Sequence, residues 1–224
     1  MKKYSLKSIS GIIFDMDGVI FDSEAIWKDA FQLANVKFGL QFTEEDRQSC
    51  CGKDEETIRK ELKNANPYLD VDGYRDFIVA QVENTVKEFG APLKDFFPEL
   101  ISFLQANHIK IALATSSKRQ RARMLFQNKG LDPSKIFHGM VFGEDVETSK
   151  PNPEIFLLAA HQIGCTPASC IVLEDSLNGI EAAKCGGFNS IMVKDLIEPN
   201  EEAKKSCLLI ADNLGEVLHY LQRK

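Results

Sequence analysis

Two carboxylates stand one residue apart directly after a short apolar run. Asp15 and Asp17 follow residues 11–14, Gly-Ile-Ile-Phe, and Gly18 comes next. Such a run is typical of a strand inside a parallel sheet, and open α/β sheets bind ligands at the carboxyl ends of their strands. Asp and Gly also follow strands because they form turns, so this segment alone leaves both interpretations open. A calcium loop of the EF-hand type is excluded, because Gly18 stands two places early and Ile26 occupies the place of the final Glu.

A second apolar run, residues 109–114, ends in the hydroxyl residues Thr115, Ser116 and Ser117. Ser116 or Ser117 can cap the helix that follows and leave its first N–H groups available to an anion such as phosphate. Taken alone, these residues are explained better by ordinary helix capping.

A single cation and a second pair of carboxylates complete the set. Lys150 precedes two prolines, Pro151 and Pro153, which fix the entry to the next helix. A lone Lys is usually a solvated surface charge, so Lys150 gains meaning only from its neighbours in space. Glu174 and Asp175 follow the apolar run 171–173, so a third strand delivers carboxylates to the same edge of the sheet.

These carboxylates together predict a metal site. With Asp15, Asp17 and Asp175 at one edge, several negative charges would lie close together, which is costly unless a cation neutralises them. The four histidines all lie outside the motifs. Mg²⁺ prefers oxygen ligands and keeps water molecules that a substrate phosphate can displace, so it is the expected cofactor.

The order and spacing of these motifs resemble the haloacid dehalogenase-like (HAD) superfamily across the whole chain. The four matching motifs are Asp15-x-Asp17, Thr115 or the following Ser116, Lys150, and Glu174-Asp175. The match is nearest to the subgroup with a helical cap inserted after the first motif, which contains sugar- and polyol-phosphate phosphatases, phosphoglycolate phosphatases and β-phosphoglucomutase. The resemblance implies a phosphoric monoester hydrolase that acts on a small phosphorylated sugar, polyol or similar metabolite.

The resemblance also implies a role for each residue. Asp15 would attack phosphorus and form an aspartyl phosphate. Asp17 would protonate the leaving oxygen and later deprotonate the attacking water, while its backbone carbonyl ligates the metal. Thr115, Ser116 and Lys150 would bind the phosphate oxygens, and Lys150 would also serve catalysis through the developing charge. The implied metal ligands are Asp15, Asp17, Asp175 and Glu174, the last either ligating the ion or orienting its waters.

The arrangement of apolar runs predicts an α/β fold. From residue 109 onward, strand-like runs alternate with amphipathic helices, which indicates a parallel sheet covered by helices. Residues 24–90 lack this alternation and are expected to form helices, for instance at 24–38 and 73–89. We therefore expect a Rossmann-like HAD core made of residues 1–22 and 91–224, with an inserted helical cap at residues 23–90. Hinges are expected near residues 21–23 and 90–93.

The cap departs from the β-phosphoglucomutase pattern. Trp27 stands where that pattern has His, and Cys51 and Glu55 align with its Lys and Arg, so the mutase machinery is expected to be absent. The segment 22–27 looks like that of hexose- and hexitol-phosphate phosphatases. Trp27 either walls the leaving-group pocket or anchors the core, and Gly52-Lys53 either reaches the cleft or forms a surface turn.

Three functions follow from these patterns. The first is a Mg²⁺-dependent phosphatase. The second is a phosphomutase of the β-phosphoglucomutase type, and the third is a catalytically silent protein that binds a phosphorylated metabolite. The intact set of Asp15, Asp17, Lys150 and Asp175 argues against the third, because binding alone needs no nucleophile.

Composition limits the partners. The chain of 224 residues carries a net charge of −6, which argues against nucleic acid and anionic membrane surfaces as partners. Four basic residues crowd the start of the helix after Thr115: Lys118, Arg119, Arg121 and Arg123. One or two of them could point into an anion-binding cleft, but we interpret them as a solvated face outside the site. Six cysteines without metal spacing, together with the absence of a secretory segment or a run of transmembrane length, favour a cytoplasmic protein. A monomer or weak dimer is expected.

Overall fold

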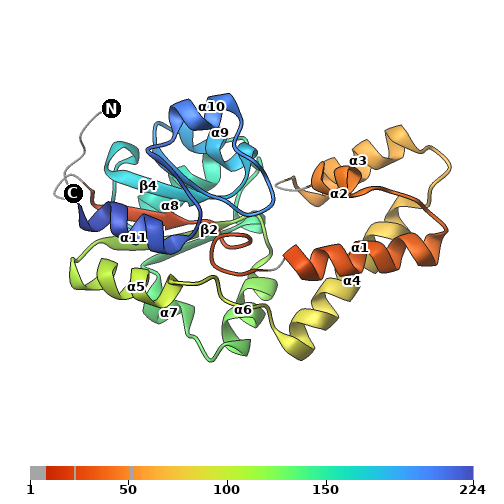
Figure 1. Ribbon diagram of the computed structural model, residues 1–224, viewed down its shortest axis with the longest axis horizontal. Coiled ribbons are helices and arrows are strands. Elements are labelled where there is room, and N and C mark those ends of the chain that lie inside the picture. Colours follow the sequence, from red (N-terminus) through yellow and green to blue (C-terminus); the bar gives the residue numbers. More distant parts are fainter. Residues whose placement is uncertain (1–8, 23, 51–52, 224) are drawn as a thin grey trace.

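The computed structural model describes residues 9–22, 24–50 and 53–223. Its strands form a six-stranded parallel sheet in the order β3-β2-β1-β4-β5-β6 (Figure 1). The strands are β1 (Gly11–Phe14), β2 (Lys110–Thr115), β3 (Gly139–Phe142), β4 (Cys170–Glu174), β5 (Asn189–Val193) and β6 (Leu209–Ala211).

Helices follow the strands and cover the sheet. The core helices are α5 (Phe97–Ala106), α6 (Arg119–Asn128), α7 (Pro133–Ile136), α8 (Glu154–Gln162), α9 (Leu177–Cys185), α10 (Glu201–Ser206) and α11 (Leu214–Gln222). Four helices come between β1 and α5: α1 (Glu24–Phe38), α2 (Glu44–Gln48), α3 (Glu55–Ala65) and α4 (Val71–Phe89).

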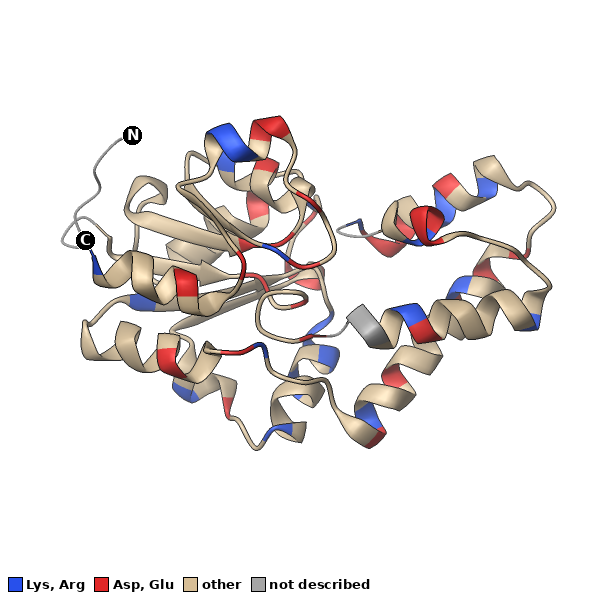
Figure 2. Cartoon of the chain, in the orientation of Figure 1, with Lys and Arg blue, Asp and Glu red and all other residues tan. Residues whose placement is uncertain are grey.

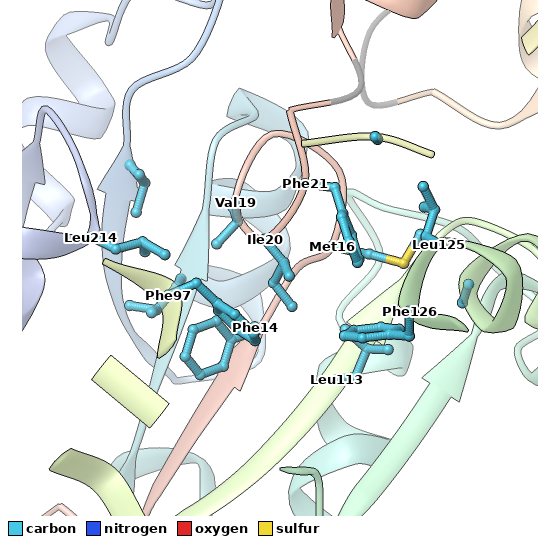
Figure 3. Close-up of a cluster of buried hydrophobic side chains, with 14 of the residues drawn as sticks. Phe14, Met16, Val19, Ile20, Phe21, Phe97, Leu113, Leu125, Phe126 and Leu214 are labelled. Atoms are coloured by element: carbon cyan, nitrogen blue, oxygen red, sulfur yellow. The ribbon is translucent and has the colours of Figure 1, made fainter. Parts of the chain in front are cut away.

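The alternation of side chains along β1 builds a core on each face of the sheet. Phe14 packs edge-on against Phe97 of α5, with ring centroids 5.9 Å apart. Ile13 points to the other face, where it joins the cluster of α8 and α9 that includes Phe156. Figure 3 shows the first of these cores, in which Phe14 and Leu113 of β2 lie beneath the loop that follows β1. Because β1 is buried on both faces, the residue after it is held firmly in place.

The helices α1–α4 lie beyond the end of the sheet, apart from the core layers (Figure 1). Their own apolar centre is aromatic: Tyr74 of α4 is fully buried and packs edge-on against Phe31, Phe38 and Phe42. The Tyr74 hydroxyl donates a hydrogen bond of 3.0 Å to Asn35 Oδ1 on α1. The predicted α/β fold with a helical cap is therefore confirmed, while the division at residues 22/23 and 90/91 stays a prediction.

The two connections between core and cap are bonded to each other. The backbone N–H of Asp22 donates to the Pro92 carbonyl at 2.9 Å, and that of Lys94 donates to the Ile20 carbonyl at 2.8 Å. Phe21, which is fully buried, packs against Phe126 of α6 with centroids 4.9 Å apart. The predicted hinge segments thus lie side by side, with Ser23 outside the described residues.

Lys and Arg are interspersed with Asp and Glu over both the core and the cap helices (Figure 2). Within the described part of the chain, every helix is too short or too polar to cross a membrane.

Candidate active site

Adjacent strands bring the two acidic motifs together at the carboxyl edge of the sheet. Phe14, the last residue of β1, lies opposite Leu173 of β4, and the N–H of Asp15 donates to the Leu173 carbonyl at 2.9 Å. This register places Asp15 beside Glu174. Asp15 is 6% exposed and Glu174 is 1% exposed, so both carboxylates are held out of water by the surrounding loops.

Lys150 lies between these two carboxylates. Its Nζ donates to Asp15 Oδ1 at 2.5 Å and to Glu174 Oε1 at 2.6 Å. The second oxygen of Glu174, Oε2, accepts from the backbone N–H and the hydroxyl of Ser176 at 2.7 and 2.8 Å. Glu174 therefore fixes Lys150, which in turn fixes one oxygen of Asp15.

Burial and crowding shift the ionisation of this cluster. Burial raises the pKa of Asp15 to about 7; the charges of Glu174 and Asp17 add to this rise, and Lys150 opposes it. Burial would lower the pKa of Lys150, but its two carboxylate partners outweigh that effect and raise it above its usual range. The half-buried Asp175 has a pKa well above its usual range, because it is partly desolvated and lies near the carboxylates of Glu174, Asp15 and Asp195.

The same cluster could hold a metal ion. Asp15, Glu174 and Asp175 each offer a carboxylate oxygen, and these atoms lie within 4.8 Å of one another. Three carboxylates against the single ammonium of Lys150 leave an excess of negative charge that a divalent cation would neutralise. Gly18 makes room for this arrangement, since its φ of +76° favours glycine and a Cβ there would collide with the Asp175 carboxylate.

Asp17 lies outside this cluster of side chains, on the side of α6. Its Oδ2 accepts hydrogen bonds from the Ser117 hydroxyl at 2.8 Å and from Arg121 Nη1 at 2.7 Å. Thr115 is buried at the end of β2, where its hydroxyl accepts from the Ser117 N–H at 3.1 Å, and Ser116 is exposed. The predicted phosphate-binding role of Thr115 and Ser116 stays a prediction.

The expectation that Ser116 or Ser117 caps the next helix is wrong. The N-cap of α6 is Lys118, which makes no capping hydrogen bond through its side chain. The Ser117 hydroxyl points to Asp17 instead of to the helix, because the charged acceptor offers a stronger hydrogen bond.

The basic cluster at the start of α6 was interpreted as a solvated face, and this interpretation is wrong for Arg121. Its side chain is only 9% exposed and forms an ion pair with Asp17, whereas Arg123 is exposed. Arg119 pairs at the surface with Asp145 at 2.7 Å. A sequence signal for Arg121 exists: it lies four residues before Leu125, on the buried side of the helix.

The cap contributes polar groups near the same edge of the sheet. Trp27 of α1 is half-buried, with the guanidinium groups of Arg75 and Arg121 at 5.9 and 5.8 Å from its ring centroid. The Ser149 hydroxyl, next to Lys150, donates to Asp54 Oδ2 at the start of α3 at 2.7 Å. Trp27 therefore lies between cap and core.

The rest of the predicted cap site is less complete. The Lys53 ammonium pairs with Glu61 at 2.7 Å, and Glu55 pairs with Arg75. Cys51, which aligns with the Lys of the β-phosphoglucomutase pattern, and Gly52 of the Gly52-Lys53 pair lie outside the described residues.

The sequence was compared with known families. Residues 12–193 match the haloacid dehalogenase-like hydrolases, a stretch that contains all four motifs. The chain belongs to this family. The predicted resemblance to HAD proteins, and the expected class of hydrolase, are confirmed.

Similar proteins include named HAD enzymes. A phosphorylated carbohydrates phosphatase of Thermotoga maritima is 34% identical over 186 residues, which cover 82% of this chain and 84% of that protein. The (DL)-glycerol-3-phosphatase 2 of Arabidopsis thaliana is 30% identical and covers 84% of this chain and 80% of its own. Among solved structures, the β-phosphoglucomutase of Clostridium difficile superposes with a TM-score of 0.79 at 25% identity, covering 96% of each chain.

Removing the Lys150 charge tests the electrostatic account of this site. Without the ammonium, two buried carboxylates lose their only described cationic partner, so Lys150→Met should lower the free energy of unfolding by about 3–5 kcal/mol in metal-free buffer. Urea unfolding followed by circular dichroism measures the change.

Lys87→Met is the matched control, because Lys87 is exposed on α4 and its loss should change stability by less than about 0.5 kcal/mol. Equal stability of the two variants would contradict the arrangement described for Lys150.

Proposed function

We propose that this chain is a Mg²⁺-dependent phosphatase that hydrolyses a small phosphorylated sugar, polyol or similar metabolite through an aspartyl-phosphate intermediate. The observation that carries the proposal is the buried Asp15 carboxylate, held at one oxygen by Lys150 beside Glu174 and Asp175. The names of two relatives, a phosphorylated carbohydrates phosphatase and a glycerol-3-phosphatase, support a phosphorylated metabolite as substrate.

The bond to Lys150 supports different roles for the two oxygens of Asp15. Oδ1 accepts from the ammonium, so Oδ2 would be the atom that attacks phosphorus. As the Oδ2–P bond forms, the ester P–O bond breaks, and Asp17 delivers a proton to the leaving oxygen. Water then attacks phosphorus, Asp17 takes its proton, and the Asp15 carboxylate is released with inorganic phosphate.

Binding of the phosphoryl group falls to the residues around Asp15. Lys150 would stabilise the charge that develops on the phosphoryl oxygens, and Thr115 and Ser116 lie at the end of the neighbouring strand β2, where they would bind the same group. Because these groups are positioned before substrate arrives, little reorganisation is needed during the reaction.

The acidic cluster would hold the Mg²⁺ ion. Asp15 and Asp175 would supply carboxylate oxygens, and the backbone carbonyl of Asp17 would complete the protein ligands. Glu174 already bonds Lys150 and Ser176, which favours orientation of the site over direct ligation. When bound, the ion would supply positive charge against the oxygens of the transferring phosphoryl group.

The helices at residues 23–90 would act as the cap that admits the substrate. The hydrogen bond from Ser149 to Asp54 joins the start of α3 to the loop that carries Lys150. The ring of Trp27 lies against the guanidinium group of Arg121 on α6. Closing of the cap would exclude water from the first step and select the leaving group. The predicted cytoplasmic location and the monomeric or weakly dimeric state stay predictions.

A phosphomutase is the second candidate, because a β-phosphoglucomutase is among the similar structures. Trp27 in place of the His of that pattern argues against it. Conversion of β-glucose 1-phosphate to glucose 6-phosphate, primed by a bisphosphate, would support the mutase over the hydrolase.

Phosphate release from a panel of substrates tests the proposed reaction. The panel consists of sugar, polyol, glycolate and nucleotide monophosphates with Mg²⁺, and at least one sugar or polyol phosphate should be hydrolysed. Asp15→Asn removes the nucleophile and should lower kcat by at least about 1,000-fold on that substrate. The same rate in wild type and Asp15→Asn would refute the assigned nucleophile.

Thermal unfolding with and without Mg²⁺ tests the metal site. At about ten times its dissociation constant, Mg²⁺ should raise the Tm of the wild type by roughly 3–6 °C, because it binds only the folded cluster. Asp175→Asn should lose most of this rise, whereas Glu83→Gln, an exposed change on α4, should keep it. An unchanged rise in Asp175→Asn would place the ion elsewhere.

A further inference from the structure

Arg121 is a buried cation with no role in the proposed reaction as described above. Its Nε and Nη2 atoms are buried and have no hydrogen-bond acceptor among the described residues. Only Nη1 is bonded, to Asp17 Oδ2 and to the Ser117 hydroxyl, both at 2.7 Å. A buried guanidinium with incomplete hydrogen bonding destabilises the fold, so packing gives no reason for an arginine at this position.

The three side chains form a closed triangle. The Ser117 hydroxyl donates to Asp17 Oδ2 at 2.8 Å, and Arg121 Nη1 contacts both partners. Two donors thus converge on one oxygen of Asp17. The Asp17 side chain is 30% exposed and that of Arg121 is 9% exposed, so the carboxyl group stays in contact with solvent while its cationic partner is buried.

The triangle is built on rigid parts of the core. Arg121 lies on α6 one turn before Leu125, which is fully buried, and Phe126 packs α6 against Phe21 of the loop that contains Asp17. All three members of the triangle belong to the core side of the two connecting segments.

We propose that Arg121 is a positioning residue, which holds the Asp17 carboxyl group in place for proton transfer to the leaving group and from water. The inference rests on the proposed function. Oδ2 can accept hydrogen bonds whether the carboxyl group is ionised or carries a proton on Oδ1, so the hold by Arg121 and Ser117 persists through both steps.

In this proposal, Oδ1 of Asp17 carries the proton that is transferred in both steps. In the first step Oδ1–H gives its proton to the ester oxygen while the P–O ester bond breaks and Asp15 bonds to phosphorus. In the second step Oδ1 takes a proton from water while the water oxygen bonds to phosphorus and Asp15 leaves. The carboxyl group ends each cycle in the protonation state in which it began.

The dependence of rate on the leaving group distinguishes positioning from a structural role. An alkoxide leaves only with help from a proton donor, whereas p-nitrophenolate leaves without one. Arg121→Met should therefore lower kcat/KM by roughly 10- to 100-fold on the best alkyl phosphate of the substrate panel, but by less than about threefold on p-nitrophenyl phosphate. Arg121→Lys should recover part of the loss, because it can still donate to Asp17 Oδ2.

Matched variants complete the experiment. Asp17→Asn should show the same difference between the two substrates, and adding Arg121→Met to it should cause little further loss, because both changes remove one function. Arg123→Met, on the exposed side of the same helix, should match the wild type. If Arg121→Met does not fold, Ser117→Ala removes the other bond to the same oxygen and should show a smaller difference of the same kind.

Two results would overturn the inference: an equal loss on both substrates, or no loss on either. A wild type that releases phosphate from no substrate would instead refute the proposed function. A wild type that is active, with the expected difference in Asp17→Asn but not in Arg121→Met, would refute the role of Arg121 alone.

Discussion

The bond between the Lys150 ammonium and the buried carboxylates of Asp15 and Glu174 is the interaction on which the rest of the site depends. Each of the three groups would be costly to bury alone, and together they neutralise most of that cost. Glu174 is itself held by Ser176 at the start of α9. The position of the Asp15 carboxylate is thus determined by two strands, one helix and one loop at once. The excess negative charge of the cluster would favour the binding of a cation.

The parallel sheet supplies the geometry that this interaction needs. β1 lies in the middle of the sheet with β2 and β4 on either side, so the residues after these strands meet at one edge. The loop after β1 turns at Gly18 and leads into the cap, and the return connection is bonded beside it through Asp22 and Lys94. The cap therefore begins only a few residues after the proposed nucleophile, so the loop that holds Asp15 also connects to the cap.

Much of this arrangement was predictable from local patterns, and the rest depends on contacts far apart in sequence. Apolar runs at residues 11–14, 109–114 and 171–173 predicted β1, β2 and β4, and the break in alternation predicted a helical cap. β3 and the short helix α2 were not predicted. Lys150 and Asp15 are 135 residues apart, so the family resemblance placed both in one site but their direct bond was not predicted. Arg121 was misjudged because a cluster of basic residues hid its place on the buried face of α6, and its partner, Asp17, lies 104 residues away.

Phosphorylation of Asp15 during turnover is the central claim of the proposed mechanism. Rapid acid quenching of the enzyme during turnover with Mg²⁺, followed by mass spectrometry of its peptides, measures this directly. We predict one phosphoryl group on the peptide that contains residues 11–18, located on Asp15 and lost on incubation with water in the folded enzyme. A phosphoryl group on another residue, or release of phosphate by Asp15→Asn at the wild-type rate, would contradict the account.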